Sequence, residues 1–250
     1  MIFDLSISFF PAQYKRLAQF AALAFAPGSG YDGASDHRGE SEAADVALYF
    51  MLNKPRRLLS AKRDAEKPTV MLCFPPELRE ALHPVGRLDM DTEGLLLFTD
   101  DGSLDHRLLM PEHHVEKEYL YRSLGHLEPE DIRRLETGVP ILHGRAVSRP
   151  AKAELLGYST IGESAALLPE LCRDKYLKNP DRPVTIGTLR VTEGRKHQIR
   201  MMLHAVGGHV FYLKRLSIAG VALDPALAPG EYRPLTKTEL VRLFAAGSAP

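Results

Sequence analysis

Residues 85–99 read VGRLDMDTEGLLLFT and place an arginine and an aspartate beside a strongly apolar segment. Gly86 permits a close turn, and Arg87 and Asp89 alternate with a leucine as they would on extended chain. Residues 94–98 are too uniformly apolar for a surface loop and predict a buried strand. The pattern therefore predicts that a rigid part of the fold holds the Asp89 carboxylate.

The composition is that of a soluble globular protein with one large domain or two small ones. The chain has 250 residues, of which 44% are hydrophobic, and its formal net charge is zero. Cys73 and Cys172 have no second cysteine or histidine at zinc spacing, so we expect neither a disulfide framework nor a metal site. This cysteine usage fits a reducing cytoplasm, where we expect the protein to act. No apolar run approaches the roughly 20 residues of a membrane span, so we expect no membrane partner.

The first residues differ in character from the rest. Residues 12–25 have the pattern of one helix, and residues 27–44 are rich in glycine, serine and acidic side chains. We therefore expect an atypical, partly disordered segment over residues 1–45 and an ordered domain over residues 46–250.

Strand and helix patterns alternate along the ordered domain. Strands are predicted over residues 46–54, 94–99, 117–124, 151–158, 184–192 and 210–223. Helices are predicted over residues 76–82, from a cap at Asp101 or Ser103 to residue 110, and over residues 129–136, 195–206 and 239–246.

A local concentration of positive charge interrupts this neutral chain. In the helix predicted to open at Arg195, Lys196, Arg200 and His204 lie four residues apart on one face, while apolar residues recur on another. No aspartate or glutamate occurs between Gly194 and residue 215. Such a patch neutralises phosphates and predicts a nucleic-acid partner, whereas the alternative is an ordinary solvated helix face.

Four motifs bear on the identity of the domain. They are residues 85–107, HHVEKEYLYR at 113–122, EGRKHQIRMMLHAVGGHV at 193–210, and PGEYRPLTKTEL at 229–240. In this order they resemble the RsuA branch of the bacterial ribosomal RNA pseudouridine synthases. The resemblance implies an α+β fold whose mixed, mostly antiparallel sheet is flanked by helices. The S4 RNA-binding domain usual in that branch has no recognisable counterpart in residues 1–45.

The resemblance also implies roles for particular residues. Asp89 matches the catalytic carboxylate, Arg200 its ion-pair partner, and Tyr119 the tyrosine that lies against the target base and is a candidate for proton transfer. Arg87 would fill the gap left by a flipped nucleotide. Pseudouridine formation breaks the C1′–N1 bond and rejoins the base through C5, and an ionised aspartate can add to carbon or stabilise a cationic sugar. No redox step or net hydrolysis occurs, so we expect no cofactor.

Further residues are predicted to contact the RNA. These are Lys54, Arg195, Lys196 and His197. A solvated lysine is an equally open interpretation for Lys54 and Lys196. The expected partner is ribosomal RNA or an assembling small ribosomal subunit, and the expected oligomeric state is a monomer. The endings GEYRPLT and EGRKHQIR favour 16S over 23S rRNA as the substrate.

Two other functions are alternatives to a pseudouridine synthase. A non-catalytic RNA-binding assembly factor would share the fold, but the intact set of Asp89, Tyr119 and Arg200 disfavours it. A calcium loop would suit the spacing of Asp89, Asp91 and the acidic residues that follow. Such a loop needs helices on both sides, and a strand pattern stands there instead.

Overall fold

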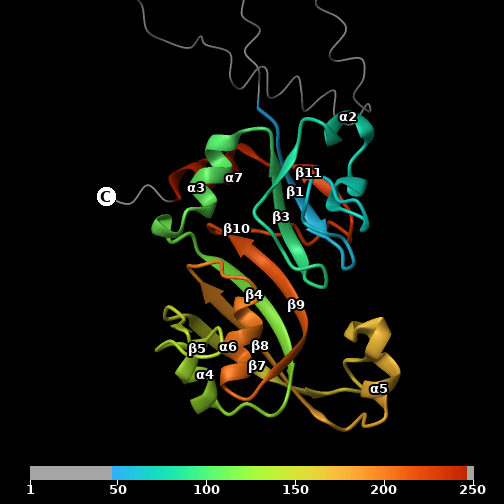
Figure 1. Ribbon diagram of the computed structural model, residues 1–250, viewed down its shortest axis with the longest axis vertical. Helices are drawn as coiled ribbons and strands as arrows, with labels where there is room; N and C mark the ends of the chain where they lie inside the picture. The colour runs from blue at the N-terminus through green and yellow to red at the C-terminus, as the bar shows by residue number, and fades with distance from the viewer. Residues whose placement is uncertain (1–46, 247–250) are drawn as a thin grey trace, which may run out of the picture. The chain divides into compact units, whose positions relative to one another are not determined.

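The structure is a computed structural model that describes residues 47–246 (Figure 1). The predictions for residues 1–45, including the helix at 12–25, lie outside the described residues, as do Val46 and residues 247–250. The strands are β1 (Tyr49–Lys54), β2 (His83–Val85), β3 (Glu93–Thr99), β4 (Lys117–Leu124), β5 (Pro140–Ile141), β6 (Ala146–Val147), β7 (Lys152–Thr160), β8 (Pro183–Val191), β9 (His209–Ile218), β10 (Val221–Ala222) and β11 (Tyr232–Pro234).

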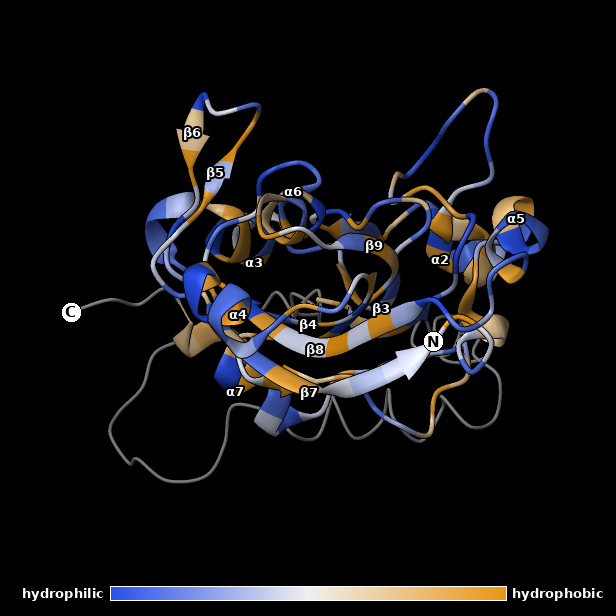
Figure 2. Ribbon diagram, turned by 90° about the horizontal axis from the view of Figure 1, so that it is seen from below, coloured by the Kyte–Doolittle hydropathy of each residue, from blue (hydrophilic) through white to orange (hydrophobic). Residues whose placement is uncertain are grey.

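Short helices connect the strands. The α-helices are α2 (Pro76–Arg79), α3 (Gly102–Leu109), α4 (Pro129–Leu135), α5 (Arg173–Leu177), α6 (Gln198–Ala205) and α7 (Lys237–Ala245). Four 3₁₀ helices complete the described residues: Val70–Cys73, Pro111–His113, Ala165–Leu167 and Glu170–Cys172. None of these helices is long and apolar enough to cross a membrane. Helices α4, α5 and α6 carry both hydrophobic and hydrophilic residues (Figure 2).

One mixed sheet organises the described residues. Its strand order is β11-β1-β3-β9-β4-β8-β7, with β2 paired to β3 and β10 paired to β9. The pairing of β3 with β9 is parallel, and the other pairings between its strands are antiparallel. The predicted α+β fold with a mixed, mostly antiparallel sheet and flanking helices is therefore confirmed.

Two apolar cores cover different parts of this sheet. The first joins β1, β2 and β3 to α3 and α7 through side chains that include Met51, Leu95, Leu97, Leu104 and Leu243. The second joins β4, β8 and β9 to α4 and α6 through side chains that include Tyr121, Ile132, Leu189, Met202 and Leu213. Strand β9 contributes Ile218 to the first core and Leu213 to the second, so its pairing with β3 is where the two parts meet.

Gly94 makes this junction possible. The parallel register pairs Glu93 with Lys214 and Gly94 with Arg215. Gly94 has a φ of 99°, and a Cβ added there would clash with the backbone carbonyl oxygen of Arg215. Only glycine combines that backbone conformation with so close an approach of a second strand.

Two predicted elements have different bounds in the structure. The helix predicted from Arg195 begins at Gln198, because His197 adopts a left-handed conformation with a φ of 55°. The strand predicted over residues 210–223 is broken at Ala219 and Gly220, whose φ values of 51° and 72° form the turn between β9 and β10. The charged residues at 195–197 therefore lie on a loop rather than on a helix face.

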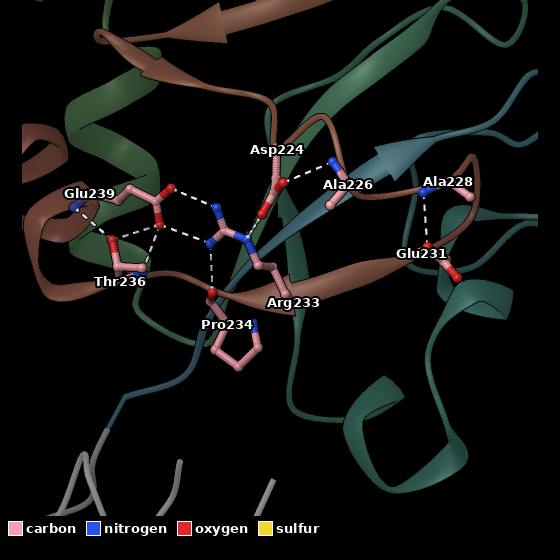
Figure 3. Close-up of polar contacts among 8 residues, drawn as sticks. All are labelled: Asp224, Ala226, Ala228, Glu231, Arg233, Pro234, Thr236 and Glu239. Carbon is pink, nitrogen blue, oxygen red and sulfur yellow. Dashed lines mark hydrogen bonds and ion pairs between the residues drawn. The ribbon is translucent and has the colours of Figure 1, made fainter. Parts of the chain in front are cut away.

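Arg233 fixes the C-terminal part of the described chain. Its Nε donates to Asp224 at 2.6 Å, and its Nη1 and Nη2 donate to Glu239 at 2.9 and 2.8 Å (Figure 3). Glu239 also completes a capping box with Thr236 at the start of α7. Since β11 pairs with β1, these contacts attach α7 to the edge strands of the sheet.

Candidate active site

Asp89 lies on the loop between β2 and β3, just before the buried strand. Ser60 Oγ donates to the Leu88 carbonyl oxygen at 2.9 Å and lies 3.1 Å from the Leu88 backbone nitrogen. The Thr92 backbone N–H donates to the Asp89 carbonyl oxygen at 3.0 Å. Buried hydrogen bonds therefore hold the backbone on both sides of the carboxylate in place.

Lys54 also supports this loop, from beneath it. Its side chain is fully buried, and Nζ donates to the carbonyl oxygens of Pro55 and Thr92 at 3.0 Å and of Met90 at 3.4 Å. Burial lowers the pKa of Lys54 to about 8, although Asp91 and Asp89 oppose the shift. Because the ammonium is fully buried and donates to three backbone carbonyls, Lys54 holds the loop in place, and its position gives no support to the predicted RNA contact.

The Asp89 carboxylate has two cationic or ionisable neighbours near α6. Arg200 Nε lies 3.7 Å from Oδ2, and His197 Nε2 lies 3.6 Å from Oδ1. Arg200 contacts Asp91 more closely, with Nη2 at 2.8 Å from its carboxylate, and its Nη1 donates to the Val210 carbonyl oxygen at 3.0 Å. Arg200 thus bridges the carboxylates of Asp89 and Asp91. The sequence predicted its pairing with Asp89 but not its pairing with Asp91.

A cavity of about 730 Å³ opens beside Asp89. Its wall includes Asp89, Tyr119 and Arg200, which are the three residues predicted to be catalytic. Tyr119 comes from β4, where it pairs with Leu189 of β8 and with Arg215 of β9. The fold therefore brings residues from three distant segments into one cavity.

The cavity wall carries more positive than negative charge. Its carboxylates are Asp89 and Glu193. Its lysines and arginines are Arg87, Lys117, Arg149, Arg195, Lys196, Arg200 and Arg215. The predicted RNA contacts Arg87, Arg195, Lys196 and His197 are exposed, which leaves them accessible to a polyanion.

Glu193 shapes the loop that carries these exposed charges, a role that the sequence did not reveal. The side chain is only 8% exposed, and it accepts hydrogen bonds from the Arg149 backbone N–H at 2.9 Å and from the Arg195 Nε at 3.0 Å. The Gln198 side-chain amide donates to the same carboxylate. The sequence did offer one signal of this role, because Glu193 is the one acidic residue of the EGRKHQ segment.

Lys117 and Arg215 are also functional candidates that the sequence did not single out. Lys117 lies two residues before Tyr119 on β4, and Arg215 is the β9 residue paired with Tyr119. Both line the cavity, and both are buried. Side chains two residues apart on a strand share a face, so the sequence could have placed Lys117 on the face of Tyr119. Nothing in the sequence identifies β9 as the neighbour of β4, so Arg215 could not be placed there.

The calcium-loop alternative does not suit the observed fold. Its residues begin in the loop after β2 and continue through β3, so a strand occupies the position where a helix would be needed. Among residues 47–246, no group of three or more His, Cys, Asp or Glu side chains is arranged to hold a metal ion.

Known proteins share this fold and these motifs. Residues 48–205 match the family model for RNA pseudouridylate synthase. An uncharacterized RNA pseudouridine synthase of Bacillus subtilis, YtzG, is 46% identical over 194 residues, which are 77% of this chain and 72% of that protein. Ribosomal small subunit pseudouridine synthase A of Escherichia coli is 36% identical over 192 residues, which are 77% of this chain and 72% of that protein.

A solved structure agrees with the sequence comparisons. The crystal structure of a pseudouridylate synthase has a TM-score of 0.64 and 36% identity, and the match covers 79% of this chain and 74% of that one. The sequence and the fold are thus both similar to those of one group of enzymes. The chain belongs to the RNA pseudouridylate synthase family, the isomerases that convert uridine to pseudouridine in RNA.

Proposed function

We propose that this enzyme isomerises one uridine of 16S ribosomal RNA, with Asp89 as its catalytic carboxylate. The observation that carries the proposal is a carboxylate on a rigid loop, beside a cation-lined cavity of about 730 Å³. The name of the Escherichia coli relative, which specifies the ribosomal small subunit, supports the choice of RNA. We further propose that residues 46–250 form the catalytic domain and act as a monomer in the cytoplasm.

The chemistry needs only groups that the cavity and the substrate supply. An oxygen of Asp89 forms a bond to C1′ of the target ribose while the C1′–N1 bond breaks, and that electron pair stays with the uracil. The base then turns, its C5 forms a bond to C1′, and the carboxylate leaves with its electron pair. C5 loses a proton and N1 gains one, so product and substrate have the same atoms.

The remaining residues have distinct proposed roles. Arg200 positions the Asp89 carboxylate by holding both it and Asp91. Tyr119 lies against the uracil and moves a proton during the rearrangement. Arg87 occupies the space that the extruded nucleotide leaves in the RNA.

The exposed loop at residues 195–197 binds the phosphate backbone of the RNA. Arg195, Lys196 and His197 contact phosphates, and this attraction offsets the few kcal/mol that base extrusion costs. The substrate is either 16S rRNA alone or the same RNA in an assembling small subunit.

The proposal is tested by mapping pseudouridine in 16S and 23S rRNA after incubation with the protein. Naked transcripts and assembling subunits are treated in parallel with the wild type and with Asp89→Asn, which keeps the shape of the side chain but removes its charge. We expect one new pseudouridine in 16S rRNA with the wild type and none with Asp89→Asn.

Other outcomes would contradict particular parts of the proposal. A product in 23S rRNA alone would refute the choice of RNA. A product that persists with Asp89→Asn would refute the role of Asp89. Tight binding to rRNA without any product would favour the non-catalytic assembly factor.

A further inference from the structure

Two buried cations lie side by side on the sheet that forms the floor of the cavity. Lys117 on β4 is 8% exposed, and Arg215 on β9 is 2% exposed. Tyr119 pairs with Arg215 across the two strands, and Lys117 precedes Tyr119 by two residues, so the three positions share one face near the same end of the strands. All three line the cavity.

Neither cation has an acidic partner within residues 47–246. Lys117 Nζ donates to the Val115 carbonyl oxygen at 3.0 Å, and Arg215 Nε donates to the Leu95 carbonyl oxygen at 2.7 Å. Arg215 Nη2 is buried and has no hydrogen-bond partner in the described part of the chain. A buried guanidinium nitrogen without a partner is costly, so a group absent from the free protein is expected to accept its hydrogen bond.

The carboxylates of the cavity do not meet this need. Asp89 lies beside Arg200 and His197, and Glu193 is engaged by Arg195 and by Gln198. Burial and the neighbouring positive charge of Arg215 lower the pKa of Lys117 to about 8. Two adjacent cations without a counter-ion favour a ligand that carries, or develops, negative charge.

Uracil suits this position better than a phosphate does. Arg195 and Lys196 are exposed and accessible to the RNA backbone. Lys117 and Arg215 are buried and lie on the two strands that pair at Tyr119, the residue proposed to contact the base. When a nucleotide is extruded, its base enters the enzyme and its phosphates remain with the strand. Uracil presents two carbonyl oxygens, which accept hydrogen bonds from ammonium and guanidinium groups.

We propose that Lys117 and Arg215 bind the carbonyl oxygens of the target uracil and stabilise the base while it carries negative charge. This inference rests on the proposed function. When the C1′–N1 bond breaks, its electron pair spreads from N1 onto the two oxygens, towards Lys117 and Arg215. The charge disappears when C5 bonds to C1′, and no proton or electron leaves the enzyme–substrate pair during these two events. Both residues are therefore catalytic through electrostatic stabilisation.

The first test compares single-turnover rates of Lys117→Met and Lys117→Arg with the wild type across pH. We expect Lys117→Met to slow the reaction about 100-fold or more, which is the usual effect of removing one hydrogen-bond donor to a developing negative charge in an enzyme. Wild-type activity should fall as pH rises above the Lys117 pKa of about 8, because the ammonium is then lost. Lys117→Arg should retain most of the rate and lose that decline, since arginine stays charged.

Other titratable groups must be separated from Lys117 in this profile. Those of the cavity are Asp89, Tyr119, Glu193, Lys196 and His197, and Lys54 beneath the Asp89 loop also has a pKa of about 8. A decline near pH 8 that persists in Lys117→Arg would assign it to another group and overturn the inference. Lys152→Met serves as the matched control, because it removes an exposed lysine outside the cavity.

The second test changes the stability of the departing base. RNA with 5-fluorouridine at the target position carries a more electron-poor base, which leaves more readily as an anion. Because fluorine replaces the C5 hydrogen, the final proton loss cannot occur on this RNA, so the rate compared on both RNAs is that of C1′–N1 bond cleavage. Lys117→Met should therefore lose several-fold less rate on this RNA than on the normal RNA. An equal loss on both would show that Lys117 does not stabilise the anion.

These outcomes separate the inference from the proposed function. A wild-type product that depends on Asp89, together with an unchanged rate and pH profile in Lys117→Met, would overturn the inference alone. The absence of product in any rRNA would refute the proposed function instead.

Discussion

Arg233 and Arg215 show how differently one side chain is used in two regions of this protein. Arg233 lies at the C-terminal edge of the sheet, where Asp224 and Glu239 both receive hydrogen bonds from it (Figure 3). Arg215 is more deeply buried, at 2% exposure, and has a backbone carbonyl as its described partner. The guanidinium of Arg233 is paired with carboxylates and stabilises the fold, whereas that of Arg215 has no carboxylate partner among the described residues and is available to a substrate.

The ionisation of the Arg233 cluster reflects this matching. The hydrogen bond to Glu239 raises the pKa of Arg233, although burial opposes the shift. Hydrogen bonds from the Ala226 backbone and from Arg233 lower the pKa of Asp224. Burial raises the pKa of Glu239, but hydrogen bonds from Arg233 and Thr236 outweigh it and the net shift is downward. Every charge in this cluster thus has a partner of opposite sign.

The largest expected effect comes from Gly94, which lets β3 approach the Arg215 backbone. We expect Gly94→Ala to lower the free energy of unfolding by about 3–5 kcal/mol, because the new Cβ clashes with a backbone oxygen at a positive φ. Gly102→Ala is the matched control, since a Cβ there meets nothing and α3 favours alanine. Urea unfolding measures both, and a loss below about 1 kcal/mol in Gly94→Ala would contradict the close approach.

The next largest effect is expected when the ion pairs of Arg233 are removed. We expect Arg233→Met to lower the free energy of unfolding by about 2–3 kcal/mol, because it leaves two half-buried carboxylates without their cation. The control is Arg63→Met, whose ion pair with Glu80 joins side chains that are 77% and 74% exposed. Exposed pairs contribute less than about 1 kcal/mol. Equal losses in the two variants would remove the distinction between a fastening pair and a surface pair.

A smaller effect of opposite sign is expected at the cavity floor. We expect Lys117→Met to raise the free energy of unfolding by about 1–2 kcal/mol at neutral pH, because it removes a buried charge next to Arg215. The unfolded chain binds more protons between the folded pKa of about 8 and the usual value of 10.5, so wild-type stability rises across that range and the advantage of the variant shrinks. A lower free energy of unfolding in Lys117→Met would instead indicate that Lys117 stabilises the fold, as Lys54 supports the Asp89 loop.

The smallest effect is the acid sensitivity of the matched cluster. The pKa values of Asp224 and Glu239 are lowered in the folded state, so their contribution to stability is present above their usual pKa values and is lost as pH falls through the folded ones. We expect wild-type stability to decline more steeply below about pH 4 than that of Arg233→Met. Parallel unfolding curves for the two proteins across this range would contradict the proposed pairing.

The sequence predicted the local elements well because their signals are local. The apolar run at residues 94–99 and the capping residue before α3 act over a few positions, and both elements appear in the structure near their predicted places. The start of α6 was misplaced by three residues, because the contacts of Glu193 and the left-handed His197 are not visible in a periodic pattern.

The charged residues of the site were harder to interpret. A lysine is rarely buried, so the sequence favours a surface position for Lys54. Two of its three backbone partners come from a loop more than thirty residues away, which no local pattern reveals. In the sequence, Arg215 only marks the end of a segment without acidic residues. Its role depends on the pairing of β9 with β3 and β4, which is a property of the sheet and not of any segment.

The most direct test of the central claim, that Asp89 breaks the glycosidic bond of a uridine, uses 16S rRNA labelled with tritium at C5 of uracil. Pseudouridine formation replaces the C5–H bond, so each turnover releases one tritium to water. We expect release by the wild type to reach one tritium per RNA molecule. Asp89→Asn should bind the RNA with similar affinity and release none, whereas release by Asp89→Asn at the wild-type rate would contradict the account.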